Sequence, residues 1–170
     1  MFRSAHLEDS NLSELAFLST LKDFEVARDK IAKDAITTPI LSMKTKNSTL
    51  FIKPECFQSV GSFKIRAGSY ALENIQIEHL KSGLVTASAG NFGQGLAKAA
   101  FSRNISLKVI APDTSSKTKI KALELLGADV KIVNFDEWWR VMMTRNSDDK
   151  GLFVHPVSEL SVILGNGSLG

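Results

Sequence analysis

The sequence has a single cysteine, Cys56, among its 170 residues. One cysteine cannot form an internal disulfide, so a reduced cytoplasm is the expected compartment and Cys56 is expected to be a small packing residue. The sequence also lacks an apolar run long enough for a secretory or membrane segment, and acidic residues near its start argue against a transit peptide. We therefore expect a soluble, cytoplasmic protein that makes no membrane contact.

Histidine and clustered charge are also scarce. His6, His79 and His155 have no cysteine or carboxylate at metal-ligand spacing, so no metal site is expected. His155, which precedes Pro156, is expected to shape a turn. The net charge is only +3 and the basic residues are spread along the chain, which argues against a nucleic-acid partner.

What the sequence does contain is an alternation of strand-like and helix-like segments. Strands are expected over residues 84–87, 107–111 and 129–133, and helices over 70–72, 94–101, 116–126 and 137–144. This order predicts an α/β fold with an open parallel sheet and helices on both faces. Gly127 is expected to adopt a left-handed conformation. Of Trp138 and Trp139, one is expected in the core and the other partly exposed.

The segments before residue 64 are less regular. Apolar residues with the spacing of one helical face predict a helix over residues 23–35, and a strand is expected over 50–53. With 44% hydrophobic residues, the chain is long enough for one sizeable core, or for a small domain with part of another. Residues 146–151 are the most loop-like stretch, and a domain crossing is expected there.

Lys64 is the strongest catalytic candidate, within residues 61–66 of sequence GSFKIR. A lysine amine forms a Schiff base with a carbonyl when burial or a nearby cation lowers its pKa. Ser62, Phe63 and Arg66 offer a hydroxyl, an apolar face and a positive charge that suit such tuning. The run alone also fits a surface lysine whose stem covers an aromatic neighbour.

A second polar segment, residues 86–95, has the pattern of a strand, a tight turn and a helix. It places Ser88 and Asn91 at the carboxyl end of a strand, beside a helix N-terminus. Ligands bind there in open α/β sheets, because unpaired amides and the helix dipole favour an anion. An N-capped helix with glycines for close packing gives the same pattern.

These two segments carry a family resemblance. Residues 55–68 resemble the cofactor-lysine signature of the pyridoxal-phosphate enzymes of the tryptophan synthase β fold, in the serine/threonine dehydratase branch. Ser88-Ala89-Gly90-Asn91 is similar to the asparagine loop of that family. Later segments match in the same order: Ala111-Pro112-Asp113, Lys119, Leu126-Gly127-Ala128-Asp129-Val130, His155-Pro156 and Gly165-Asn166-Gly167-Ser168.

The resemblance implies roles for these residues. Lys64 would form the Schiff base with pyridoxal 5′-phosphate and later remove the α-proton of the substrate. Phe63 would pack near the cofactor ring, and Asn91 would hydrogen-bond its 3′ oxygen. The substrate carboxylate would be held by the loop of Ser88, Ala89, Gly90, Asn91 and Phe92. The implied reaction converts the amino acids L-serine or L-threonine to a 2-oxo acid and ammonia.

Some positions depart from related branches. Ile65 stands where threonine and cysteine synthases usually have aspartate, which favours the dehydratase and racemase branch. Ala89 replaces a serine that serves the opposite substrate face in serine racemases, which favours dehydration. Phe92 in place of the usual histidine leaves the choice between serine and threonine open.

The resemblance also implies an incomplete second α/β domain. In the family, the glycine-rich loop for the cofactor phosphate follows the segment that resembles residues 165–170, and this sequence has no two adjacent glycines. We assign residues 1–54 to the N-terminal portion of the larger domain, 55–150 to a complete small α/β domain, and 151–170 to the return into the larger domain. Exposed apolar surface is expected on the N-terminal part and on residues 154–169.

Three functions stay open. The chain is part of a pyridoxal-phosphate-dependent dehydratase, inactive alone and completed by a homo-oligomer or a C-terminal fragment. Alternatively, it is a catalytically silent α/β module with a binding or regulatory role, or a serine racemase-like enzyme.

Overall fold

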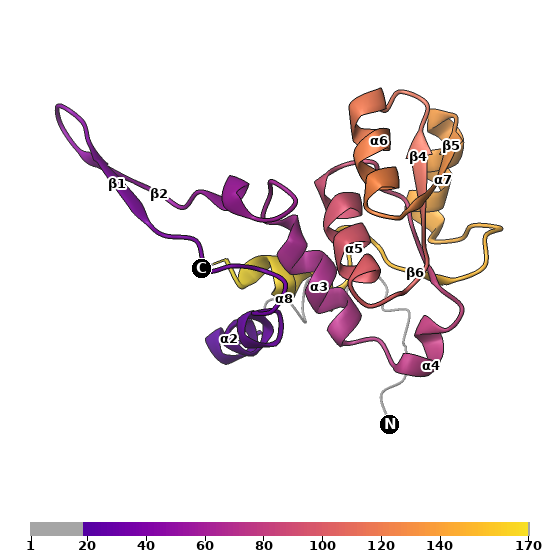
Figure 1. Cartoon of the computed structure of the whole chain (residues 1–170), viewed down its shortest axis with the longest axis horizontal. Coiled ribbons are helices and arrows are strands. Elements are labelled where there is room, and N and C mark those ends of the chain that lie inside the picture. Colours follow the sequence, from indigo (N-terminus) through magenta and orange to yellow (C-terminus); the bar gives the residue numbers. More distant parts are fainter. Residues whose placement is uncertain (1–18, 170) are drawn as a thin grey trace.

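The computed structural model describes residues 19–169 (Figure 1). Residues 1–18 and Gly170 lie outside this range, and with them the start of the 1–54 assignment and His6. The elements are α2 (Leu21–Lys30), β1 (Leu41–Lys44), β2 (Thr49–Ile52), the 3-10 helix η1 (Glu55–Phe57), α3 (Lys64–Glu73), α4 (Ile77–Leu80), β3 (Leu84–Thr86), α5 (Asn91–Phe101), β4 (Leu107–Pro112), α6 (Lys117–Leu125), β5 (Asp129–Val133), α7 (Phe135–Thr144), β6 (Leu152–Phe153) and α8 (Leu160–Gly167).

Four parallel strands form the main sheet, in the order β5-β4-β3-β6. Val85 of the central strand β3 lies opposite Lys108 of β4 and Phe153 of β6. Side chains alternate between the faces, so Leu84 packs with α5 and α6 while Val85 packs with α7. The predicted α/β fold, with a parallel sheet covered on both faces, is confirmed.

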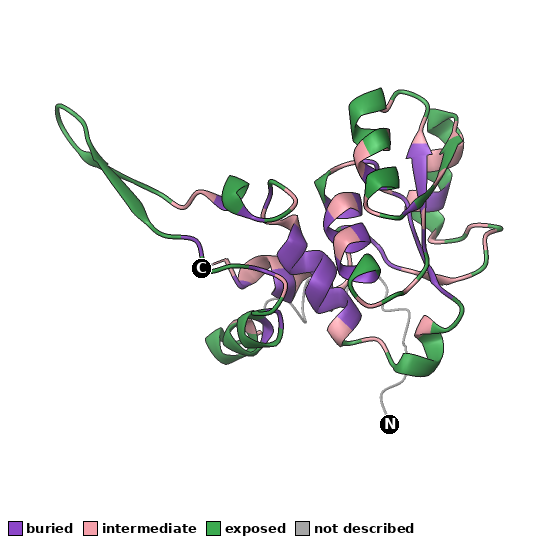
Figure 2. Cartoon of the chain, viewed as in Figure 1, coloured by how far each residue is buried: buried purple, intermediate pink, exposed green. Residues whose placement is uncertain are grey.

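Helix α3 lies at the centre of the molecule and is almost entirely buried (Figure 2). One of its faces packs against α5, and another meets α2 and α8 in a second apolar cluster. That second cluster contains the buried residues Ala27, Ile31, Ala35, Ile65, Tyr70 and Leu164. Because both clusters share α3, a shift of this helix disturbs both of them.

The predicted apolar face of residues 23–35 is confirmed, although the helix itself is shorter. Helix α2 ends at Lys30, and residues 31–35 continue as turns that keep Ile31 and Ala35 buried. The expected strand near residue 50 is also present as β2. Its antiparallel partner β1 was not expected, and Leu41 of β1 pairs with Ile52 of β2.

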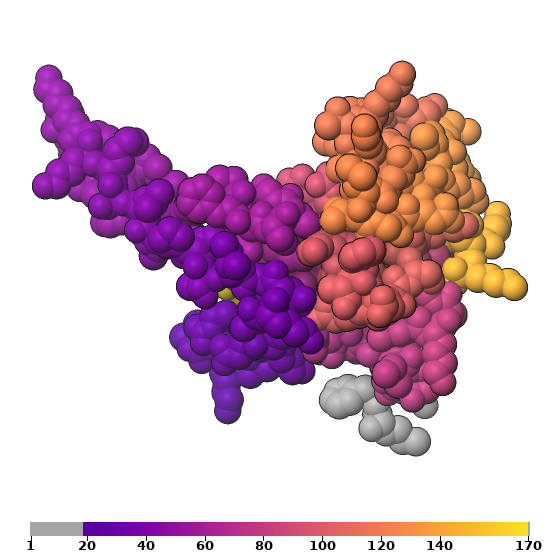
Figure 3. Space-filling model, viewed as in Figure 1, coloured from indigo at the N-terminus to yellow at the C-terminus, as the bar shows by residue number. Residues whose placement is uncertain are grey.

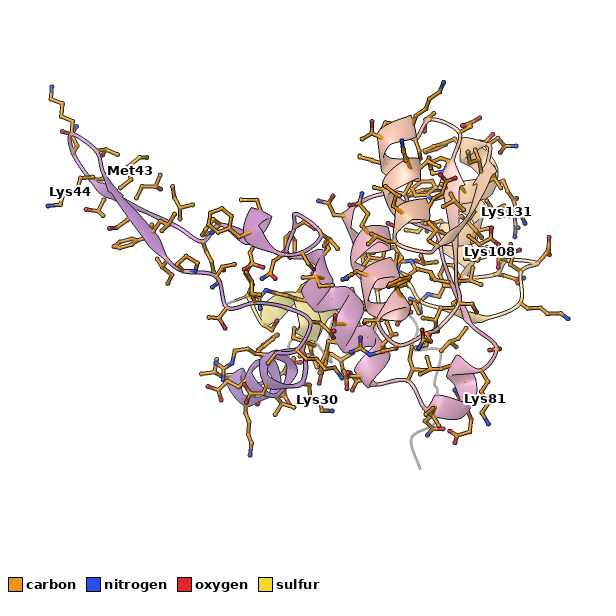
Figure 4. All side chains as sticks on the ribbon, viewed as in Figure 1. Lys30, Met43, Lys44, Lys81, Lys108 and Lys131 are labelled. Atoms are coloured by element: carbon orange, nitrogen blue, oxygen red, sulfur yellow. The ribbon has the colours of Figure 1, made fainter. Side chains whose placement is uncertain are left out.

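The β1–β2 hairpin extends away from the body of the molecule (Figures 1 and 3). Every residue of both strands is exposed, including Phe51, which is 69% exposed. Met43 and Lys44 project from its outer part (Figure 4). An isolated two-stranded hairpin is at best marginally stable in water. The expectation of exposed apolar surface on the N-terminal part is therefore confirmed.

The same expectation is wrong for most of residues 154–169, although Val157 is 61% exposed. Helix α8 packs against α2 and α3, and Val154 and Val162 are buried. Glycines make this contact possible, because a Cβ on Gly165 would lie 2.7 Å from the Arg66 carbonyl oxygen. A Cβ on Gly167 would lie 2.2 Å from the Phe24 ring.

The loop before β6 is tied to the sheet. Asp149 accepts hydrogen bonds from Lys108 of β4 at 3.0 Å and from Lys131 of the neighbouring strand β5 at 2.9 Å (Figure 4). These two hydrogen bonds lower the pKa of Asp149, and the bond from Lys131 has the larger effect.

Cys56, expected to be a packing residue, is exposed instead, because it lies on the outer side of η1. Within residues 19–169, no helix is long and apolar enough to cross a membrane.

Candidate functional site

Lys64 is the first residue of α3, and its amine is partly buried. Its Nζ donates a hydrogen bond to Asn166 Oδ1 at 3.3 Å and lies 4.8 Å from the centre of the Phe63 ring. Burial lowers the pKa of Lys64 below that of an ordinary lysine. A larger fraction of this amine is therefore neutral, and nucleophilic, at a given pH.

Arg66 does not supply the tuning charge that the sequence indicated. Its guanidinium forms a two-pronged ion pair with Glu55, at 2.8 Å from Nε and 2.9 Å from Nη2, and both side chains are buried. Its charge is therefore already balanced by a carboxylate. Burial, rather than a neighbouring cation, accounts for the lowered pKa of Lys64.

Helix α5 is placed against Lys64 by glycine. A Cβ on Gly95 would lie 2.3 Å from the Lys64 carbonyl oxygen, and one on Gly68 would lie 2.5 Å from the Gly95 carbonyl carbon. Only glycine at both positions lets the two backbones approach so closely. Asn91 is one helical turn before Gly95, so it projects from the same face of α5, at its exposed N-terminus.

The N-terminus of α5 offers free amides to a ligand. The first helical bond runs from Gln94 N to Gly90 O, and no side chain caps the helix. The amides of residues 91–93 precede that bond. In α6, by contrast, the cap residue Ser116 already accepts a hydrogen bond from the Lys119 amide. Helix α5 is thus the better placed of the two to bind a carboxylate.

The loop that begins at Ser88 folds tightly over this helix end. A Cβ on Gly93 would lie 2.0 Å from the Ser88 carbonyl oxygen, so glycine is required there. Phe92, one of the predicted substrate-binding residues, has its side chain in the main core. Only its backbone amide is left to contact a ligand.

A cavity of about 400 Å³ opens beside this loop, at the carboxyl ends of β3 and β4. Its walls are the Ser88–Gly90 loop, the β4–α6 turn, Lys119 and Trp138. Trp138 packs with the cluster around Val141, whereas Trp139 is 50% exposed, as the sequence predicted. Hydroxyl groups and a lysine give this cavity a polar character that suits an amino-acid side chain or carboxylate.

The structure thus brings the predicted residues together in two groups. Ser88, Ala89 and Gly90 line the cavity, while Lys64 and Phe63 lie at the start of α3. Sequence reasoning gave Asn166 no role, although its segment was noted as a family landmark. Asn166 lies 102 residues after Lys64, so no local sequence pattern could indicate their contact.

His155 shapes a turn as expected, because its Nδ1 accepts a hydrogen bond from the Ser158 amide at 2.9 Å.

The residues around Lys64 fit the aldehyde end of pyridoxal phosphate. They offer an amine of lowered pKa, an aromatic wall from Phe63 and an exposed amide on Asn91. Ser62 Oγ is buried without a hydrogen-bond partner among residues 19–169, so a polar group remains to be satisfied next to the lysine. Within the same residues, no cluster of three or more histidine, cysteine or acidic side chains could hold a metal ion.

Comparison with known proteins gives a consistent result. The family model described as "Pyridoxal-phosphate dependent enzyme" matches residues 31–170. The L-threonine dehydratase catabolic TdcB of Staphylococcus aureus is 32% identical over 165 residues, which cover 92% of this chain and 47% of that protein. A serine racemase of Dictyostelium discoideum is 33% identical over 160 residues, which cover 88% of this chain and 48% of that protein.

Solved structures resemble the chain in the same way. The crystal structure of the Dictyostelium discoideum serine racemase has a TM-score of 0.76 and 32% identity, covering 86% of this chain and 49% of that one. The processed form of threonine deaminase isoform 2 from Solanum lycopersicum has a TM-score of 0.78 and 29% identity, and the match covers 96% of this chain and 45% of that one. The chain therefore spans about half the length of the relatives it matches.

Proposed function

Because the chain belongs to the family of pyridoxal-phosphate-dependent enzymes, we propose that it carries the reactive lysine and substrate loop of an ammonia-lyase. The proposed reaction converts L-threonine or L-serine to a 2-oxo acid and ammonia. The observation that carries this proposal is the partly buried Lys64 amine at the start of α3, whose backbone packs against Gly95, one turn after the uncapped N-terminus of α5.

When bound, pyridoxal phosphate supplies an electron sink for the charge that develops at the α-carbon of the amino acid. Lys64 would supply the amine that binds the cofactor covalently and would later accept the α-proton of the substrate on Nζ. Its lowered pKa suits the second role, because a base must be neutral to accept a proton. Phe63 shields one side of that amine from water.

The α5 terminus would orient the amino acid. The amides of residues 91–93 point out of an uncapped helix end, where the helix dipole favours a carboxylate. Ser88 adds a hydroxyl from the loop, and Ala89 and Gly90 leave room beside it. The Asn91 amide would hydrogen-bond the 3′ oxygen of the cofactor ring.

We further propose that activity needs a second body of protein. The resemblance places the cofactor phosphate on a glycine-rich loop outside these residues, and the relatives are about twice as long as the matched region. The apolar hairpin β1–β2 is uncovered in the single chain. A C-terminal fragment or a second copy of the chain would cover it. In this division, residues 1–54 and 151–170 belong to the larger domain and 55–150 to the small one.

Mixing the chain with pyridoxal phosphate tests the role of Lys64. We expect an absorbance band near the visible edge, which borohydride removes while fixing the cofactor mass on the peptide that contains Lys64. Lys64→Ala should abolish both signals completely. Because burial lowers the pKa of Lys64, the adduct should form at a lower pH than it does with exposed lysines.

Lys81→Ala is the matched control, since Lys81 is an exposed lysine directly after α4 (Figure 4). This variant should keep the full band. If the wild-type chain gives no adduct at any cofactor concentration, cofactor binding by this chain alone is ruled out.

Turnover by the purified chain separates the remaining candidates. We expect no 2-oxo acid from L-serine or L-threonine above the Lys64→Ala background, because lost phosphate contacts weaken the anchoring of the cofactor. Steady release of a 2-oxo acid would contradict the proposed need for a second body and exclude a silent module. Formation of D-serine would instead favour racemisation, the activity named for the Dictyostelium discoideum relative.

A further inference from the structure

We infer that Asn166 is a positioning residue for the Lys64 amine. The inference rests on the proposed function and extends it, because it assigns a role to a residue 102 positions away from the lysine. Asn166 Oδ1 accepts the hydrogen bond from Lys64 Nζ at 3.3 Å. It holds the amine at a fixed distance from α8 without adding a charge.

The packing of α8 fixes the position of Asn166. Gly165, its neighbour, lies so close to α3 that a Cβ would be 2.8 Å from Ala67 Cα. On the other side, Ser168 Oγ donates to the Gly165 carbonyl at 2.7 Å, which closes the helix end. Asn166 also accepts a hydrogen bond from the Leu169 amide on its own carbonyl oxygen. The close contact of Gly165 with α3 and the two hydrogen bonds at the end of α8 therefore fix the backbone from which the Asn166 side chain projects.

The charged side chains of the helices around Lys64 are not its hydrogen-bond partners, so Asn166 is the polar group described as contacting the amine. On α3 itself, Arg66 is paired with Glu55 from η1. Helix α8 has no ionisable side chain between Leu160 and Gly167. Helix α5 carries Lys98 about one turn after Gly95, and Lys30 of α2 lies over the Tyr70 ring. The lowered pKa of Lys64 is nevertheless caused by burial and not by either of these cations.

A neutral acceptor has a specific consequence here. An amide oxygen orients the amine but stabilises its protonated form less than a carboxylate does. The amine stays in place and still loses its proton readily, since burial keeps its pKa low. An asparagine at position 166 thus orients the Lys64 amine without raising its pKa as a carboxylate would.

Competitive labelling of amines tests this directly and needs no cofactor. Trace acetic anhydride is added to the folded chain across a pH series, and the label on the peptide containing Lys64 is measured by mass spectrometry against Lys81 in the same sample. Asn166→Asp places a negative charge beside Nζ and should raise the pKa of Lys64. Labelling near neutral pH should then fall about tenfold.

Asn166→Leu should shift the profile the other way. It keeps the size of the side chain and removes the acceptor, so the protonated amine loses a hydrogen bond and its pKa falls. Labelling near neutral pH should rise about threefold. Ser161→Ala, at the opposite end of α8, should leave the pH profile of labelling unchanged. Asn166→Gln keeps an amide acceptor, so labelling of Lys64 near neutral pH should stay within about twofold of wild type.

Opposite shifts in the two Asn166 variants would support the inference, because a purely structural defect moves both profiles in the same direction. Equal shifts, or none, in variants that keep the wild-type circular dichroism would overturn it. The proposed function is tested separately by the cofactor adduct. Opposite shifts without any adduct in the wild-type chain would keep the role of Asn166 and reject cofactor binding by this chain alone.

Discussion

Arg66→Met should lower the free energy of unfolding by about 3–5 kcal/mol, because it leaves a buried carboxylate without its partner. Glu55 and Arg66 have side chains only 9% and 4% exposed. Besides the arginine, Thr38 Oγ1 donates to Glu55 at 2.6 Å and Gln58 Nε2 donates at 3.1 Å. Arg66 in turn donates to the Ile36 carbonyl at 3.1 Å. The network ties the segment before β1 to the start of α3.

Chemical denaturation of the variant set measures this effect. The double variant Glu55→Leu, Arg66→Met should regain most of the lost stability, since apolar side chains of similar volume replace a buried pair at little cost. Arg28→Ala removes the exposed Arg28–Asp29 pair, whose side chains are 52% and 70% exposed, and should cost less than about 1 kcal/mol. A loss as small in Arg66→Met as in Arg28→Ala would contradict the structure.

The same pair predicts a pH dependence. Burial acts to raise the pKa of Glu55, but hydrogen bonds from Arg66 and Thr38 outweigh it, so the pKa lies below its ordinary value. A carboxyl group with a lowered folded-state pKa stabilises the fold above its unfolded pKa of about 4.3 and loses that effect as the pH falls through the folded value. The stability gap between wild type and Glu55→Gln should therefore narrow below about pH 4.

The sheet was predictable because its signals are local. Strands β3 and β4 are short and mostly apolar, β5 alternates polar and apolar residues at its start, and the helices between them repeat apolar residues with the helical period. Gly127 has a φ of +80° and ends α6 as predicted. Strand β6 was missed, because two residues are too few to carry a pattern.

Helix α8 and the hairpin show what local patterns cannot give. Gly165 and Gly167 lower the helix propensity of α8, yet their missing side chains are what lets it pack against α3 and Phe24. Strand β1 is fully exposed in the described chain, so it has no buried face to produce alternation.

Candidate site residues could be named from the sequence only where they lie close together in it. Lys64 and the loop at Ser88 lie in two compact segments that resemble family signatures. Arg66 was given the wrong role, because its ion pair with Glu55 depends on how η1 folds over α3. Partners 11 or 102 residues apart are set by packing, which no local pattern reports.

The contact of α3 with α5 leads to the second large effect. Gly95→Ala places a Cβ 2.3 Å from the Lys64 carbonyl oxygen and 2.9 Å from the Ile65 amide nitrogen. Both atoms belong to the backbone of α3, so no side-chain rotation relieves the clash. The two helices must separate, at an expected cost of about 3 kcal/mol in the free energy of unfolding.

Separation should also disable the site. Asn91 lies on the same face of α5 as Gly95, so moving that face away from Lys64 also moves the asparagine away from the lysine-bound cofactor whose 3′ oxygen it is proposed to hydrogen-bond. We expect Gly95→Ala to lose the borohydride-stable adduct under conditions in which the variant is still folded. Gly90→Ala is the control for stability, because its Cβ would meet only Ser88 Oγ at 4.0 Å, and its unfolding free energy should stay within about 1 kcal/mol of wild type. An unchanged melting temperature in Gly95→Ala would mean that α3 and α5 do not touch as closely as described.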